Sequence, residues 1–210
     1  DENLLRVGKE CLTMETGLYA ANGFCSWSEY GSMPDWNVRL VKNMDNAFSG
    51  LATFNVDLSG WNTSQVTSMN SLFKGAAAFN QDISAWDISQ VTSAKSMFSG
   101  ASSFNQNLSS WDASKLTIAE AMFEATSAFD SVLKDWNVSN LKTTRKMFTL
   151  SAFDQDIGAW NTSKVTDMSD MFLGASLFNR DLSRWSTSEV TSMNNMFKNA
   201  PLFAYDVSEW

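Results

Sequence analysis

The chain has 210 residues, of which 44% are hydrophobic and 13% aromatic, and this composition excludes a disordered protein. Its formal net charge of −8 disfavours binding to nucleic acid and to anionic lipid surfaces. The chain has no histidine and no apolar stretch of about 18 residues, so we expect no membrane insertion of this segment and no histidine-based catalysis or metal binding.

The first segment, residues 1–35, is predicted to form an N-terminal cap. Residues 4–12 (LLRVGKECL) have a helical apolar spacing, and a solenoid needs a terminal cap to cover its first unit. Cys11 and Cys25 lie in this segment, and their separation matches no metal motif. In an oxidising compartment they are expected to form a disulfide, whereas in a cytosolic protein they would be buried thiols.

The rest of the chain is a repeat, set by tryptophans that recur every 25 residues with one step of 24. The seven units of residues 36–210 start at Trp36, Trp61, Trp86, Trp111, Trp136, Trp160 and Trp185, and Trp210 is the first residue of an eighth. Fourteen of the fifteen phenylalanines fall into two columns with the same period. Such a period predicts a solenoid, because each unit can bury its apolar face only against its neighbours.

Each unit is predicted to contain a short helical turn and a short strand. Residues 66–73 (VTSMNSLF) have the apolar spacing of a helical face, whereas residues 79–84 (FNQDIS) alternate as in a strand that would pair in parallel with its equivalents. The helical turn is expected to end with a positive φ at Gly50, Gly75, Gly100 and Gly174. The one-residue deletion between Phe148 and Phe153 indicates a loop there.

The repeated phrases resemble a known family. YGSMPDWNV (30–38), WNTSQVTSMNSLFKGAAAFNQDIS (61–84) and WNTSKVTDMSDMFLGASLFNRDLS (160–183) are similar to the DUF285 surface-protein repeat, which is related to the BspA-like leucine-rich repeats. This resemblance implies a leucine-rich-repeat-like solenoid on secreted or surface-anchored proteins of bacteria, protists and algae. It also implies an adhesive role and no catalytic residues.

A column of carboxylates recurs in the phrase that precedes each tryptophan. It contains Asp57, Asp82, Asp156, Asp181 and Asp206, with Asn107 and Val132 as interruptions, and a column of Asn and Asp residues lies two positions earlier. Stacked carboxylates repel one another, and Ca²⁺ would relieve this repulsion. We favour the alternative that these side chains bond to backbone groups at the corners of the coils. A contact with a sugar or a protein is the third interpretation, and Ca²⁺ is the only cofactor considered.

Two further features have both a structural and a functional interpretation. The tryptophan column could stack on sugars, but its regularity favours a core role. Asn-x-Ser/Thr sequons occur at Asn62, Asn107, Asn137 and Asn161, and they predict glycosylation if the chain follows a eukaryotic secretory route.

A small basic cluster lies where the repeat is least regular. It consists of Lys134, Lys142, Arg145 and Lys146, on an otherwise acidic chain. Because the core columns continue through this region, the cluster is a candidate patch for a partner, with neutral drift of a solvated face as the alternative.

The chain contains none of the common catalytic motifs, so we do not expect an enzyme. The sequence predicts a non-catalytic module, extracellular or at the cell surface, that acts in structure, adhesion or binding of surface or matrix proteins or glycans. The alternative is a Ca²⁺-dependent surface assembly or filament element with ions on the aspartate column. The last residue opens a new unit, which predicts either further repeats of the same protein or another domain or chain against that end.

Overall fold

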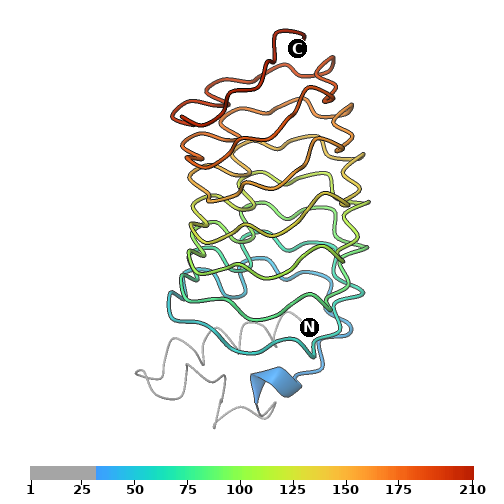
Figure 1. Ribbon diagram of the computed structural model, residues 1–210. Helices are drawn as coiled ribbons and strands as arrows, with labels where there is room; N and C mark the ends of the chain where they lie inside the picture. The colour runs from blue at the N-terminus through green and yellow to red at the C-terminus, as the bar shows by residue number, and fades with distance from the viewer. Residues whose placement is uncertain (1–31) are drawn as a thin grey trace.

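The computed structural model describes residues 32–210, which wind into coils stacked along one axis (Figure 1). We number the coils 1 to 7 by the tryptophans that open the predicted units. The regular helix of the described residues is η2, a 3₁₀ helix at Met33–Asp35 with Pro34 in its first turn. The predicted helical cap and the Cys11–Cys25 pair lie outside the described residues, apart from residues 32–35 of the cap. No helix within 32–210 is long and apolar enough to cross a membrane.

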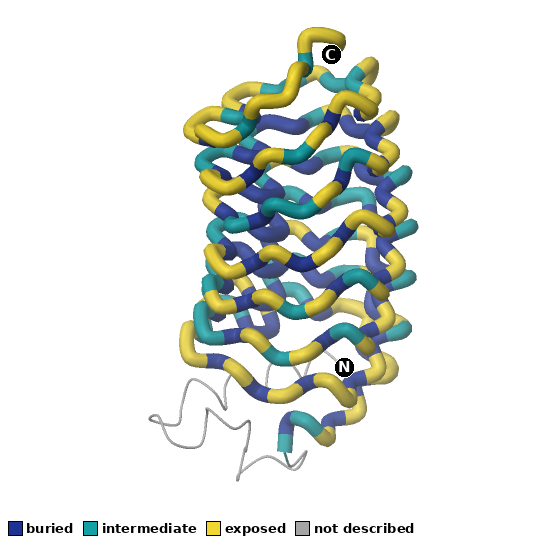
Figure 2. The backbone as a smooth tube through the Cα atoms, viewed as in Figure 1, coloured by how far each residue is buried: buried dark blue, intermediate teal, exposed yellow. Residues whose placement is uncertain are grey.

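The core is a ladder of stacked aromatic rings with the 25-residue period. The rings of Phe73 and Phe79 stack within one coil with centroids 3.8 Å apart, and Phe73 stacks on Phe98 of the next coil at 5.7 Å. Trp61 and Trp86 stack in the same way at 6.3 Å. Figure 2 shows buried positions recurring in register from coil to coil. This buried, periodic ladder confirms the prediction of a repeat solenoid.

The tryptophans are core residues rather than a sugar-stacking surface. Those that open coils 1 to 7 are only 3–4% exposed. The indole N–H groups also have fixed partners inside the stack: Nε1 of Trp61 donates to the Met33 carbonyl at 3.0 Å, and Nε1 of Trp86 donates to the Leu58 carbonyl at 3.0 Å. A ring held in this way has no free face to offer a ligand.

The segment predicted as a helical turn forms overlapping turns instead. Alternate N–H groups donate to the next coil, as from Met69 to the Ser93 carbonyl at 3.0 Å and from Ser71 to the Lys95 carbonyl at 2.7 Å. The N–H groups between them close tight turns within the coil, as from Leu72 to the Met69 carbonyl at 3.3 Å. The prediction of a helix over 66–73 is therefore wrong, because half of the backbone donors that a helix needs are bonded to the neighbouring coil.

In each coil, this turn segment has a positive φ at two positions that are four residues apart. The prediction for the glycine column is confirmed, with φ of 71° at Gly75 and similar values at its equivalents. Non-glycine residues adopt the same conformation, including Ser71 at 54°, Ala125 at 55° and Leu150 at 55°. Each of them costs about 1 kcal/mol relative to glycine, which the stacking of the coils offsets.

The parallel contact between coils lies elsewhere than predicted. It consists of isolated bridges through Asn43, Ser68, Ser93, Ile118, Thr143, Asp167 and Ser192. Residues 79–84 form no strand, although Phe79 and Ile83 are buried and the residues between them are more exposed, as the alternation predicts. The reason is that side-chain oxygens accept backbone N–H groups there, and these donors are then lost to a strand ladder.

The deletion in coil 5 is absorbed by the loop at residues 149–152. The rings of Phe148 and Phe153 still stack at 4.0 Å, close to the 3.8 Å of the equivalent pair in coil 2. The Ser151 hydroxyl accepts the Phe153 N–H at 3.1 Å. The two aromatic anchors therefore keep their register while the loop between them shortens.

Candidate functional site

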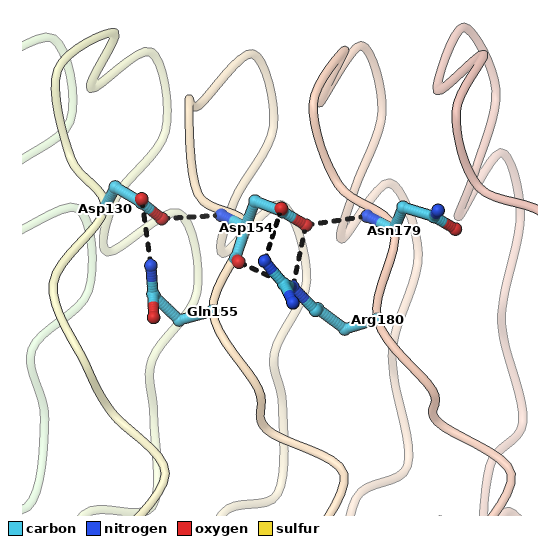
Figure 3. Close-up of polar contacts among 5 residues, drawn as sticks. All are labelled: Asp130, Asp154, Gln155, Asn179 and Arg180. Atoms are coloured by element: carbon cyan, nitrogen blue, oxygen red, sulfur yellow. Dashed lines mark hydrogen bonds and ion pairs between the residues drawn. The ribbon is translucent and has the colours of Figure 1, made fainter.

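A continuous polar ladder runs along one flank of the solenoid. We call it the Asx ladder, and it consists of Asn55, Asn80, Asn105, Asp130, Asp154 and Asn179. The Oδ1 atom of each accepts the backbone N–H of the equivalent residue one coil later, as from Asn105 to Asn80 at 2.9 Å and from Asp154 to Asp130 at 2.8 Å. Figure 3 shows three successive members of the ladder. These side chains join the coils, as the hydrogen-bonding interpretation of the sequence expects.

A second column of longer side chains covers the ladder. We call it the cover column; its members in coils 2 to 6 are Gln81, Gln106, Ser131, Gln155 and Arg180, and Val56 and Tyr205 occupy the same position in coils 1 and 7. Nε2 of Gln106 donates to Asn80 Oδ1 at 2.8 Å. Arg180 donates from Nη2 to Asp154 Oδ2 at 2.7 Å and from Nε to the Asp154 carbonyl at 2.7 Å (Figure 3). The cover column therefore adds a nitrogen donor over the ladder in most coils.

Coil 4 lacks this cover, and a groove lies there. Ser131 is too short to reach the ladder; it is buried, and its hydroxyl accepts the Leu108 N–H at 3.1 Å. The groove has a volume of about 470 Å³. Its lining includes Asn105, Asn107, Asp130, Ser131, Val132 and Asp135. The hollow thus lies at the boundary of coils 3 and 4, where both surface columns depart from the repeat.

The groove is negatively charged and has a small apolar wall. Asp130 and Asp135 are exposed, and no lysine or arginine is among its lining residues. Val132 stands where most other coils have an aspartate, and its side chain is 40% exposed. The groove therefore favours a ligand that combines positive charge with some apolar surface.

The aspartate column makes turns within single coils. Oδ1 of Asp82 accepts the Ser84 N–H at 2.9 Å, and Oδ1 of Asp156 accepts the Gly158 N–H at 2.9 Å. Equivalent bonds join Asp57 to Ser59, Asp181 to Ser183, Asp206 to Ser208 and Asn107 to Ser109. The backbone N–H and then the hydroxyl of the following serine lower the pKa of Asp57, Asp82, Asp181 and Asp206, since both bonds favour the ionised carboxyl.

These hydrogen bonds engage one oxygen of each carboxylate in the column. Residues 32–210 contain no group of three or more acidic or cysteine side chains arranged to hold a metal ion. The Ca²⁺ hypothesis for Asp57, Asp82, Asp156, Asp181 and Asp206 stays a prediction.

The sequon asparagines are exposed and form similar turns. Oδ1 of Asn62 accepts the Ser64 N–H at 3.1 Å, and Asn137 and Asn161 make the same bond in their coils. Asn107 lines the groove, so a glycan on this residue would compete with a ligand. Glycosylation at the four sites stays a prediction.

The basic cluster is divided between two segments. Lys142, Arg145 and Lys146 belong to the turn segment of coil 5, whereas Lys134 precedes Trp136 on the flank that holds the groove. Nη1 of Arg145 lies 4.0 Å from Glu120 Oε1, so part of its charge is compensated. The cluster stays a candidate patch. The groove, which lies on the same flank as Lys134, was not predicted from the sequence, although Ser131 in a column with glutamine in coils 2, 3 and 5 was a readable signal.

Stacked coils, a buried aromatic ladder and polar columns on the surface together define a repeat-solenoid protein. A family model described as a Mycoplasma protein of unknown function, DUF285, matches residues 20–136 and 120–210. The chain therefore belongs to the DUF285 family, as its repeated phrases suggest. A search of curated proteins finds no match.

Proposed function

We propose that this chain is a non-catalytic binding module, related to the leucine-rich-repeat solenoids, that acts in structure or adhesion outside the cell or at its surface. Its partners are surface or matrix proteins or glycans. The observation that carries the proposal is the groove at coils 3 and 4. There the surface columns change at Ser131 and Val132, while Phe104 and Phe129 in the core beneath stay fully buried.

This combination is typical of a binding site on a repeat scaffold. A periodic core supplies the stability, so surface positions can vary without unfolding the array. A hollow that interrupts the surface but leaves the core filled therefore offers recognition at little structural cost.

The titratable groups support a non-catalytic role. Among residues 32–210, the carboxyls with a displaced pKa have it lowered, and the main cause in each is the turn that it makes with a nearby serine. A general acid would need a raised pKa at one distinct place. These carboxyls instead resemble one another from coil to coil.

A binding screen with one matched variant tests the proposal. The labelled chain is applied to arrays of matrix peptides and glycans, beside the variant Ser131→Gln, which restores the residue of the cover column and fills the groove. Binding by the original chain that the variant loses supports the proposal. If every signal is the same for both chains, the groove is not the binding site and the proposal fails.

Location is tested separately in the organism that makes the protein. Surface biotinylation of intact cells, followed by digestion, identifies which lysines react. Exposed Lys42, Lys142 and Lys164 should be labelled without lysis if the module faces the outside. Labelling only after lysis would contradict the proposed location.

A further inference from the structure

The groove lies where other coils place a planar nitrogen donor. Asn80 Oδ1 of coil 2 accepts two hydrogen bonds from coil 3, from the Asn105 N–H at 2.9 Å and from Gln106 Nε2 at 2.8 Å. One coil later, Asn105 Oδ1 accepts the Asp130 N–H at 2.9 Å, and Ser131 supplies no nitrogen to it. A carbonyl oxygen has two lone pairs, so Asn105 can accept a second donor from the groove.

An equivalent position of the scaffold holds a guanidinium over an aspartate, whereas the ladder residue at the groove is Asn105, which offers Oδ1 but an NH₂ group in place of the second carboxylate oxygen. Two coils further on, Arg180 occupies the cover column and donates three hydrogen bonds to Asp154. Two of these bonds are 2.7 Å long, and they use both a carboxylate oxygen and the backbone carbonyl (Figure 3). The spacing of the ladder is therefore compatible with the forked geometry of a guanidinium.

The charges around the groove favour a cation over a neutral amide. Asp130 and Asp135 line it, and no lysine or arginine is among the lining residues, although Lys134 precedes Asp135 in the chain. Both oxygens of Asp130 accept hydrogen bonds from coil 5, from the Asp154 N–H at 2.8 Å and from Gln155 Nε2 at 2.9 Å, so this carboxylate is held at the edge of the groove and contributes its charge without a direct bond to a ligand. Exposed Val132 offers an apolar contact for the methylene groups of an arginine side chain.

A sugar ring is less well matched to these walls. No aromatic residue is among the lining residues, and nearby Trp136 is buried with its N–H bonded to the Leu108 carbonyl at 2.9 Å. The volume of about 470 Å³ also exceeds what one arginine side chain fills, which leaves space for the neighbouring residues of an extended peptide.

We infer that the groove between coils 3 and 4 binds an arginine side chain on an extended segment of a partner protein. The guanidinium donates to Asn105 Oδ1 and lies between Asp130 and Asp135, in the place that Gln106 and Gln155 fill for their own coils. This inference rests on the proposed function and names the chemistry of its ligand.

The test is an NMR titration of the ¹⁵N-labelled chain with the blocked peptide acetyl-Gly-Arg-Gly-amide. We expect saturable shifts at the side-chain amide of Asn105 and the backbone amide of Asn107. The same peptide with citrulline keeps the N–H donors but lacks the charge, and it should bind roughly tenfold more weakly. Added salt should weaken the arginine peptide more than the citrulline peptide.

Two variants locate the binding. Ser131→Gln should weaken binding of the arginine peptide by about tenfold or more. It also removes the acceptor of the Leu108 N–H, so the melting temperature should fall modestly, and the amide spectrum checks that the variant stays folded. Gln81→Ser is the matched control, since it makes the reverse exchange in coil 2, away from the groove. It should leave the affinity for the peptide unchanged.

The outcomes separate this inference from the proposed function. Equal binding of the arginine and citrulline peptides, or equal binding to the chain and to Ser131→Gln, overturns the inference. Glycan binding that Ser131→Gln abolishes, without peptide binding, overturns the inference and leaves the proposed function standing. An absence of groove-dependent binding to any peptide or glycan overturns both.

Discussion

Asn80 and Asp82 lie two positions apart and have nearly the same side-chain shape, yet they bond in different directions. Oδ1 of Asn80 reaches the backbone of the next coil, whereas Oδ1 of Asp82 turns back to Ser84 in its own coil. From the sequence we could predict that both columns bond to backbone groups. The direction of each bond could not be predicted, because it depends on how far the neighbouring coil is displaced along the axis.

The hydrogen bonds between the aspartate column and the serines two positions later make the free energy of unfolding fall at acidic pH. Because the folded-state pKa of Asp57, Asp82, Asp181 and Asp206 lies below the ordinary value of 3.8, their stabilisation is present above that pH and is lost as the pH falls through the folded-state values. A variant with all four of these aspartates changed to asparagine keeps a side-chain oxygen that can accept the serine N–H. Asn107 already does so, since its Oδ1 accepts the Ser109 N–H at 3.0 Å.

We therefore expect this variant to be slightly less stable than the original chain at neutral pH and to lose less stability in acid. Urea unfolding at neutral pH and at a pH near 3 measures the difference. Parallel losses in the two chains would contradict the assignment of the shifts to these turns.

A single core hydroxyl is the clearest site for a stabilising change. Thr144 is 2% exposed, and its Oγ1 has no hydrogen-bond partner among the described residues. Thr144→Val removes this buried polar group with little change of shape, and it should raise the free energy of unfolding by about 1 kcal/mol. The matched control is Thr126→Val, because Thr126 is equally buried but its hydroxyl donates to the Phe123 carbonyl at 2.6 Å.

The control should lower stability by about 1 kcal/mol, and chemical denaturation measures both changes. If both valine variants change the free energy of unfolding in the same direction, the unsatisfied hydroxyl of Thr144 does not explain the effect at this position.

At the scale of an element, the apolar pattern correctly predicted which residues are buried but not the backbone that buries them. Val66, Met69, Leu72 and Phe73 are all fully buried, as the helical spacing predicts. Overlapping turns also return a side chain to the same face after three residues, so their pattern is close to that of a short helix. The positive φ that distinguishes them occurs at Ser71 as well as at Gly75, and serine gives no signal of it in the sequence.

The Asx ladder predicts a sharp difference between two changes at one residue. Asn80→Ala removes the acceptor for both the Asn105 N–H and Gln106 Nε2, and it should destabilise the chain by about 1–2 kcal/mol. Asn80→Asp keeps an acceptor of the same shape, and Asp130 and Asp154 already serve in that position. It should therefore cost much less than the alanine variant.

Thermal and urea unfolding of the two variants measure this difference. Hydrogen exchange at the Asn105 amide adds a local readout, since only the alanine variant should expose it faster. Equal destabilisation by alanine and aspartate would show that the ladder oxygen is not what holds the coils together.

At the scale of the whole molecule, the features that repeat identify the family and the features that depart from the repeat locate the candidate site. The aromatic columns stay buried through coils 3 to 5, although the neighbouring methionine column changes to Ala94, Ala119 and Thr144. The period and the family can be recognised in the sequence from these aromatic columns. The groove depends on residues 105–109 of coil 3 lying against residues 130–135 of coil 4, and only the stacking of the coils reveals the hollow that Ser131 and Val132 leave between them.

The effect of calcium on the melting temperature of the whole solenoid tests whether the aspartate column binds this ion. An ion that binds only the folded chain raises its melting temperature with calcium concentration. The aspartate column offers a weak site, since one oxygen of each carboxylate is bonded to backbone, and Arg184 lines the cavity of about 220 Å³ between Asp156 and Asp181. A positively charged side chain beside two carboxylates lowers their affinity for a second cation. We therefore expect the same melting temperature in millimolar calcium chloride and in EDTA. Sodium chloride of equal ionic strength is the control, because screening alone stabilises a chain of charge −8.

A saturable rise in melting temperature that calcium produces, that sodium does not produce and that EDTA reverses would contradict this expectation and favour a calcium-dependent assembly element.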